Sequence, residues 1–326
     1  EFMRDYGLEI LIQTARYWKS RFTYDSGNDC YNLLFVKGPN EYGGVINNNL
    51  YTVMLATYNM ESAKKYIQRI KAEYAEAYHA LVEKIGFAEQ EVSGWEDIIK
   101  NVVINYDSSK SLYLEDDNFL KLEPLEHGKV KNGDEPLYKK ICFDRLQRYR
   151  VLKQADVILL MLLLPKRFST LEQFAAWNYY EPLTTHDSSL SYGTHSTFAA
   201  KLSHLEEAYG YFLKSVNLDL KNIMDNTQKE GIHFAASGAS WQAVINGFSG
   251  VELADGNLTI NPKMPKQWEK LSFRLYYHQC LLKISISQEE ISVTYEEGNA
   301  EAVELTVADR GIHLTKGKEV NIPFLS

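Results

Sequence analysis

The sequence contains little cysteine and no recognisable metal-binding pattern. Its 326 residues include only three cysteines, which lie far apart and form no CxxC pair. An odd number of widely spaced cysteines is typical of a reduced, cytoplasmic protein and argues against a disulfide scaffold. HExxH motifs, cysteine–histidine clusters and acidic calcium loops are also missing, so we expect no metal ion and no other cofactor.

Long apolar runs and excess positive charge are missing as well. The longest apolar run, Val157 to Leu164, is too short to cross a bilayer, and the first residues show no signal-peptide pattern. The net charge of −8 argues against a nucleic-acid partner, because such proteins usually present a basic face. No Walker or GxGxxG motif implies a nucleotide. We therefore expect a cytoplasmic protein with neither a membrane nor a nucleic-acid partner.

Two hydrophobic patterns divide the chain near Gly250. Before this residue, apolar side chains recur at helical spacings. Helices are expected over 2–22, 47–62, 62–85, 89–104, 143–164, 168–178, 193–218 and 238–248. After it, short β-branched and aromatic segments alternate as in strands. The pattern predicts a mainly α domain over 1–249, in which paired helices form a barrel, and a small antiparallel β domain over 250–326 that is a sandwich or a sheet packed on helices.

The loop from Gly38 to Tyr42 contains the first candidate for chemistry. Glu41 follows a Gly-Pro turn. If its carboxyl group packs against Tyr42 and Tyr51, desolvation would raise its pKa, as a general acid near neutral pH requires. The same residues also fit an ordinary turn followed by an asparagine helix cap.

Three further polar segments are candidates for substrate contacts. Lys153 and Gln154 precede an apolar helix and can bind sugar hydroxyls, and a lysine can also meet phosphate. Residues 179–191 are rich in Ser, Thr and Tyr and also contain Glu181, His186 and Asp187. Residues 231–241 place small residues and His233 before a helix N-terminus, which favours an anion. Polar turns, a polar loop and a serine-capped helix are the alternative interpretations.

A serine–histidine–aspartate triad is not inferred from His186, Asp187 and Ser188. Residues adjacent in sequence rarely reach triad geometry, and no GxSxG elbow precedes them.

Taken together and in this order, the segments resemble glycoside hydrolase family 65, which includes maltose, trehalose, kojibiose and nigerose phosphorylases. The resemblance covers nearly the whole chain. Its motifs are Glu1 to Gly7, Gly38 to Tyr42, Asn48 to Thr52, Lys153 to Val157, Tyr180 to Pro182, Thr185 to Ser191, His195-Ser196, His233 to Trp241 and Asn261 to Pro265 leading into Leu271 to Phe273. The resemblance implies part of an (α/α)₆ barrel followed by a small β domain.

The resemblance also assigns roles to individual residues. The general acid of the family falls on Glu41, and its glucosyl-binding Lys-Gln pair falls on Lys153 and Gln154. The phosphate-binding residues of the family fall on His233, Ser237, Gly238, Ser188 and Ser189.

Several features depart from the family pattern. Asn40 and Gly43 stand where the family often has Asp and His, and the Ser of the segment after His233 is displaced by one place. Family members also carry a large N-terminal β domain and opening barrel helices, so the resemblance implies that this chain is a fragment with an incomplete active site.

The implied reaction is inverting phosphorolysis of an α-glucosidic disaccharide, with phosphate as co-substrate. Glu41 protonates the leaving oxygen, phosphate attacks the anomeric carbon, and β-glucose 1-phosphate and an acceptor sugar result. Thr185-His186-Asp187 favours the kojibiose-type members. The alternatives are a hydrolase of the same family that uses Glu181 as base, and a structural or carbohydrate-binding fragment. The oligomeric state is open, with a homodimer among the states allowed.

Overall fold

The computed structural model describes residues 1–130, 135–254 and 256–323, and these form two compact units. The first unit comprises Glu1–Val130 and Leu137–Thr185. The second comprises the described residues from His186 onward together with 135–136.

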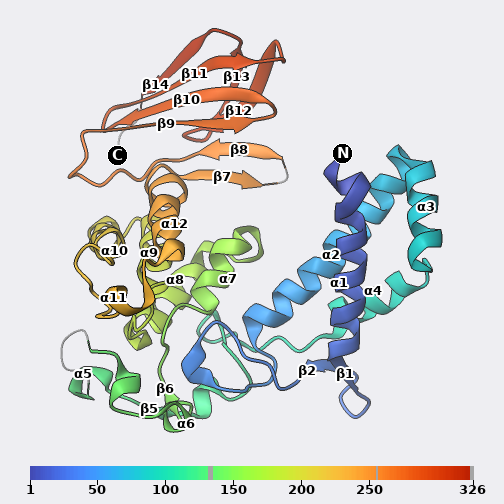
Figure 1. Cartoon of the computed structure of the whole chain (residues 1–326), viewed down its shortest axis with the longest axis vertical. Helices are drawn as coiled ribbons and strands as arrows, with labels where there is room; N and C mark the ends of the chain where they lie inside the picture. Colours follow the sequence, from blue (N-terminus) through green and yellow to red (C-terminus); the bar gives the residue numbers. More distant parts are fainter. Residues whose placement is uncertain (131–134, 255, 324–326) are drawn as a thin grey trace. The chain divides into compact units, whose positions relative to one another are not determined.

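Helices that pack around α2 form the start of the first unit (Figure 1). A π-helical turn, Met3–Gly7, leads into α1 (Leu8–Arg21), and the hairpin β1 (Phe22–Asp25) and β2 (Cys30–Leu33) follows. After the loop that carries Glu41 come α2 (Leu50–Glu73), α3 (Ala75–Ile85) and α4 (Glu91–Asn101). Their core contains Ile12, Val53, Met60, Trp95 and Ile98.

The predicted break near residue 62 is wrong, because α2 runs without interruption to Glu73. Its buried positions Val53, Met60, Ala63 and Ile67 continue one apolar stripe through the expected boundary. The helix ends only where Tyr74 leaves helical geometry with φ −141° and ψ 58°.

The remainder of the first unit consists of short elements. These are β3 (Tyr106–Asp107), β4 (Leu112–Tyr113), β5 (Glu123–Pro124), α5 (His127–Val130), α6 (Phe143–Leu146), β6 (Tyr149–Arg150), α7 (Val157–Leu163) and α8 (Thr170–Tyr180). The single helix predicted over 143–164 is therefore wrong. β6 pairs with β5, and the extended Leu152 bridges to Thr184, so these backbone groups bond across the unit.

Four helices begin the second unit. They are α9 (Ser191–Lys201), α10 (Leu205–Val216), α11 (Thr227–Glu230) and α12 (Phe234–Gln242), and a π-helical turn over Ala243–Phe248 extends α12. The helix predicted over 193–218 is split between α9 and α10. Ser203 adopts φ 65° at the break, and this left-handed backbone cannot continue a right-handed helix.

Eight strands form two four-stranded sheets after this turn (Figure 1). They are β7 (Val251–Ala254), β8 (Asn257–Ile260), β9 (Lys270–Tyr277), β10 (Cys280–Ser287), β11 (Glu290–Gly298), β12 (Ala302–Val307), β13 (Arg310–Thr315) and β14 (Glu319–Pro323). The sheet orders are β14-β11-β10-β9 and β13-β12-β8-β7. Residues such as Ile284 and Val293 from one sheet and Ile260 and Leu305 from the other share one core.

The fold class predicted from the sequence, a helical part followed by a small β-sheet domain, is confirmed. The strand pairs of these two sheets are antiparallel except for one, because β8 and β12 run parallel through Thr259 and Thr306. The boundary between 249 and 250 stays a prediction. Within the described ranges, no helix combines the length and the hydropathy that a membrane crossing requires.

Candidate active site

The loop that carries Glu41 is fixed to the structure by close packing at Gly38. A Cβ atom at this position would lie 2.5 Å from Asp156 Oδ2 and 2.7 Å from Asn49 Cγ. Gln154 Nε2 also donates to the carbonyl oxygen of Pro39 at 2.9 Å. The loop therefore sits directly against two segments that are remote in sequence, one at the start of α2 and one before α7.

Asn40 is the centre of the hydrogen-bond network around this loop. Its side chain is almost fully buried, and its Oδ1 accepts the backbone N–H groups of Tyr42 at 3.2 Å and Lys153 at 3.0 Å. Its Nδ2 donates to Glu115 Oε1 at 3.0 Å and to the carbonyl oxygen of Val151 at 3.4 Å. Its backbone N–H donates to Asp156 Oδ2 at 3.2 Å.

Glu41 itself begins a 3₁₀ turn, Glu41–Gly43, that Asn40 caps. Its side chain is 42% exposed, and its Oε2 forms an ion pair with Lys153 Nζ. The predicted burial of this carboxyl group against Tyr42 is not found. Tyr42 is instead buried in an apolar cluster with Leu137 and Val151. Glu41 is thus firmly held at its backbone while its carboxyl group faces solvent and a cation.

Lys153 is far less exposed than its partner. Its side chain is 14% exposed, and its ammonium group lies 5.6 Å from the ring centre of Tyr138 and 5.8 Å from that of Phe143. Such cation–π contacts fix the ammonium group without neutralising it. Lys153 and Glu41, predicted from separate segments, are therefore brought together as one charged pair.

Gln154 is buried and only partly satisfied. Its Nε2 bonds to Pro39, but among the described residues no hydrogen-bond partner reaches its buried Oε1. A buried carbonyl oxygen without a partner costs free energy and can accept a hydrogen bond from a ligand hydroxyl. The structure thus brings Glu41, Lys153 and Gln154 together in one unit, and their roles in catalysis and sugar binding stay predictions.

Sequence reasoning missed two buried carboxyl groups behind this pair. Asp156 is fully buried, and desolvation raises its pKa to about 7, although the backbone N–H of Asn40 and the side chain of Asn49 bond to it. Glu115 is also fully buried, and desolvation followed by repulsion from Asp156 raises its pKa well above its ordinary value. The one sequence feature that could have pointed to a buried carboxyl group is Asp156 itself, an acidic residue directly before an apolar segment.

The Thr184-Thr185 segment lies beside Lys153 and Gln154. The backbone N–H of Thr185 donates to the carbonyl oxygen of Leu152 at 2.8 Å, and Leu152 N–H donates to Leu183 at 2.9 Å. Glu181 begins a 3₁₀ turn, Glu181–Leu183, at the end of α8. The parallel bridge between Leu152 and Thr184 thus fixes the middle of the polar segment 179–191 beside Lys153.

His233 in the second unit is oriented by the carboxylate of Asp219, which no sequence motif indicated. Its Nδ1 lies 2.6 Å from Asp219 Oδ1, and its backbone N–H donates to Asp219 Oδ2 at 2.8 Å. Thr227 Oγ1 donates to the same carboxylate at 3.1 Å. Asp219 therefore engages Nδ1 of the imidazole and leaves Nε2 as the ring nitrogen that can meet a ligand.

The backbone of α12 provides less of an anion site than predicted. The N–H groups of Phe234, Ala236 and Ser237 already donate to Ile232 or His233. Ser237 and Gly238 are exposed on the helix. Any anion here would therefore be held chiefly by the His233 ring and the Ser237 hydroxyl.

Ser188 and Ser189 form a half-buried turn directly before α9. Ser188 Oγ accepts the backbone N–H of Leu190 at 3.3 Å. Tyr192 near the start of α9 and Ala236 near the start of α12 belong to one apolar cluster, so these helices pack together near the ends that follow the two polar loops. The role of these serines in phosphate binding stays a prediction.

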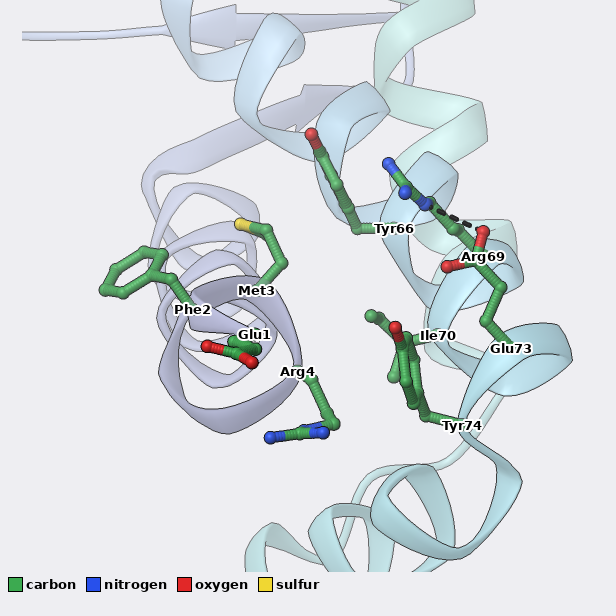
Figure 2. A pocket seen from close by; sticks show the side chains of 9 residues that line it. All are labelled: Glu1, Phe2, Met3, Arg4, Tyr66, Arg69, Ile70, Glu73 and Tyr74. Carbon is green, nitrogen blue, oxygen red and sulfur yellow. Dashed lines mark hydrogen bonds and ion pairs between the residues drawn. The ribbon is translucent and has the colours of Figure 1, made fainter. Parts of the chain in front are cut away.

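A pocket of about 240 Å³ lies elsewhere in the first unit, between the N-terminal turn and α2. Figure 2 shows its lining, in which Arg69 bonds to Glu73 and the side chain of Arg4 lies near Tyr74. None of the candidate site residues lines it. In the parts of the chain that the structure describes, no group of His, Cys, Asp and Glu side chains is arranged to hold a metal ion.

Curated proteins of known activity align with almost all of this chain. An α,α-trehalose phosphorylase from Thermoanaerobacter brockii is 34% identical over 98% of the chain and 41% of its own length. A kojibiose phosphorylase from Caldanaerobacter subterraneus subsp. tengcongensis is 34% identical over 98% of the chain and 40% of its own length. The chain thus spans about two fifths of the length of these relatives.

A solved structure and two family models also match this chain. A structure named "Putative kojibiose phosphorylase from human microbiome" superposes with a TM-score of 0.89 at 28% identity, covering 99% of this chain and 44% of its own. The glycosyl hydrolase family 65 central catalytic domain matches residues 1–242, and the C-terminal domain of that family matches residues 251–314. The chain therefore belongs to glycosyl hydrolase family 65.

Proposed function

We propose that the protein containing this chain is an inverting glycoside phosphorylase, which cleaves an α-glucosidic disaccharide with inorganic phosphate. Family membership and the similarity to trehalose and kojibiose phosphorylases support this proposal. The products are β-glucose 1-phosphate and the acceptor sugar. We further propose that the protein is cytoplasmic and works without a metal ion or organic cofactor, with a homodimer among the assemblies allowed.

The arrangement of Glu41, Lys153 and Gln154 carries the proposal. A solvent-facing carboxyl group stands on a capped turn and pairs with a partly buried ammonium group. Beside it lies the Gln154 amide oxygen, for which the described residues provide no hydrogen-bond partner. Lys153 and Gln154 supply donors and an acceptor for sugar hydroxyls. A hydroxyl that engages the Lys153 ammonium group would release Glu41 to protonate the glycosidic oxygen as general acid.

Phosphate replaces the second carboxylate of an inverting glycosidase in this mechanism. A glycosidase needs a base roughly 6.5–9.5 Å from the acid to activate water. Phosphate is already a nucleophile and needs to be held and oriented, for which we propose His233, Ser237, Gly238, Ser188 and Ser189. Asp219 supports this role because it bonds to His233 Nδ1, which makes Nε2 the ring nitrogen that would meet phosphate.

The release of glucose 1-phosphate from defined disaccharides tests the proposal. The complete protein is incubated with kojibiose, trehalose, maltose or nigerose, with and without phosphate, and glucose 1-phosphate and free glucose are quantified. We expect phosphate-dependent formation of the β anomer, with kojibiose as the first substrate to test because of Thr185-His186-Asp187. Equal release of free glucose without phosphate would refute phosphorolysis and favour a hydrolase.

A further inference from the structure

Two aromatic rings lie beside the ammonium group of Lys153, and both are partly open to solvent. Tyr138 is 36% exposed and Phe143 is 42% exposed. Their ring centres lie 5.8 Å apart with an angle of 17° between the ring planes, so the two rings form one stacked pair, the aromatic platform. The Lys153 ammonium group lies 5.6 Å and 5.8 Å from the two ring centres. The platform thus adjoins the cation that pairs with Glu41.

Buried apolar residues hold the platform in place. Tyr138 directly follows Leu137, and Phe143 begins the helical turn that ends at Leu146. Both leucines are fully buried in one apolar cluster together with Tyr42. The ring of Tyr42 also meets that of Phe143 edge to face, with the ring centres 5.6 Å apart. Since Tyr42 belongs to the turn that carries the proposed general acid, the platform is packed against that turn.

A platform of this kind matches the chemistry of a sugar ring. One face of a pyranose carries mainly C–H groups, and stacking this face on aromatic rings removes apolar surface from water. Ligand sites typically combine aromatic walls with a few polar groups that fix the orientation of the ligand. The Lys153 ammonium group and the Glu41 carboxyl group are the polar groups next to these rings.

The burial of Gln154 indicates which sugar of the disaccharide the platform contacts. The glucosyl unit is proposed to bind Lys153 and Gln154, and Gln154 is buried, with its amide nitrogen bonded to the carbonyl oxygen of Pro39. The glycosidic oxygen that Glu41 protonates joins this unit to the acceptor sugar. With the glucosyl unit at the buried amide, the more exposed platform beside the same ion pair is the aromatic surface available to the acceptor sugar.

We propose that Tyr138 and Phe143 form the acceptor subsite, in which the acceptor sugar stacks on the aromatic platform while Glu41 protonates its leaving oxygen. This inference rests on the proposed function, because it gives a place to the acceptor of that reaction. It adds a contact with substrate to the cation–π contact that both rings make with Lys153. Kojibiose, trehalose, maltose and nigerose all release glucose as acceptor, so glucose is the probe.

The reverse reaction of the complete enzyme separates the acceptor from the other substrate. β-Glucose 1-phosphate and glucose are combined, the release of phosphate is followed, and each KM is measured with the other substrate saturating. In Tyr138→Leu and in Phe143→Leu, we expect the KM for glucose to rise about tenfold, which corresponds to ~1.4 kcal/mol. The KM for β-glucose 1-phosphate and kcat should both stay within about threefold of wild type, because the lost contact is made only with the acceptor.

Variants that keep a ring distinguish stacking from an indirect effect through Lys153. Tyr138→Phe and Phe143→Tyr retain the aromatic face, so the KM for glucose should stay within about threefold of wild type. If these variants bind glucose as poorly as the leucine variants, stacking is not the cause and the proposal is wrong. If the leucine variants raise both KM values equally or mainly lower kcat, the rings only hold Lys153, and the proposal is wrong as well.

Tyr106→Leu is the matched control. Tyr106 on β3 is also 42% exposed, and its ring centre lies 4.6 Å from that of Tyr113 on β4. Its replacement should leave the KM for glucose unchanged, and a tenfold rise of the kind expected at the platform would overturn the assignment.

Direct binding of glucose separates this inference from the proposed function. If the reverse reaction does not occur, phosphorolysis is wrong, and saturation-transfer NMR then compares glucose binding by the wild type and the two leucine variants. Weaker binding by these variants supports the platform, and equal binding refutes it. Normal phosphorolysis with an unchanged KM for glucose in both leucine variants refutes the platform alone.

Discussion

The backbone N–H of Lys153 donates to the side-chain oxygen of Asn40 at 3.0 Å, across 113 residues of sequence. Asn40 directly precedes Glu41, whose carboxyl group pairs with the ammonium group of the same lysine. The two segments are thus joined at the backbone as well as at the side chains. This double connection gives the Glu41 carboxyl group a defined place despite its exposure to solvent.

Replacing Glu41 by Gln in the complete enzyme should remove the proton donor and keep its shape. General acid catalysis contributes typically ~10²–10⁴-fold, so we expect kcat to fall by that order while the KM for the disaccharide changes little. Steady-state phosphorolysis of the disaccharide measures both. A variant that keeps more than about a tenth of wild-type kcat, a loss below ~1.4 kcal/mol, would show that Glu41 is not the acid. Glu181→Gln is the companion variant. It should lower kcat strongly only if the protein is a hydrolase that uses Glu181 as its base.

Replacing His233 by Ala should weaken phosphate binding selectively. A charge-assisted hydrogen bond contributes roughly 1.5–3 kcal/mol, so the KM for phosphate should rise about tenfold or more while that for the disaccharide stays nearly constant. Asp219→Asn should produce a smaller change in the same direction, because Asn can still bond to the ring but holds it less firmly. An equal rise in both KM values would indicate that His233 only holds its loop.

Replacing Gly38 by Ala should destabilise the first unit. Its Cβ atom would lie 2.5 Å from Asp156 Oδ2 and 2.7 Å from Asn49 Cγ, both buried, and overpacking typically costs ~1–3 kcal/mol. Thermal unfolding should show a lower melting temperature. Gly210→Ala is the control, because this residue lies within α10 with open space around its Cβ position, and alanine there should be neutral or stabilising. Equal melting temperatures for the two variants would contradict the packing argument.

Stability should depend on pH through Asp156. Burial raises the pKa of this carboxyl group from 3.8 to about 7, so the folded protein binds the proton more tightly than the unfolded chain does. The protonated group therefore makes its full contribution to the free energy of unfolding below about pH 4, and this contribution is lost as pH rises toward about 7. In denaturant unfolding, the free energy of unfolding of the Asp156→Asn variant should decrease less across this pH range than that of the wild type. Parallel curves for the two proteins would contradict the assignment.

Sequence patterns predicted the fold class because hydrophobic periodicity reports local structure well. The change near Gly250 from helical spacing to alternation corresponds to real helices and strands. The failures lie where tertiary contacts override local preference. Residues 143–164 have helical composition, yet Leu152 bonds to Leu183 and Thr185 in an extended bridge that no local pattern indicates.

The candidate residues of the first unit could be named from the sequence because each lies in a short local motif. Their proximity in space depends on the fold. Glu115 was missed because no local motif marks it. It stands in the acidic run Glu115-Asp116-Asp117, which has the composition of a surface loop. Only the packing of remote segments around Asn40 and Asn49 buries it. Asp219 was missed similarly, because its relation to His233 depends on a loop closing between α10 and α12.

The parallel pairing of β8 with β12 has a consequence for how this protein is made. Thr259 meets Thr306 only after β9, β10 and β11 have been synthesised, so the hairpin of β7 and β8 leaves the ribosome with one edge unpaired. Such non-local pairing slows folding and exposes strand edges to other chains in the meantime. Nascent chains that end before β12 should therefore be the species most dependent on chaperones, and truncation in this region should cause aggregation before it affects the helices.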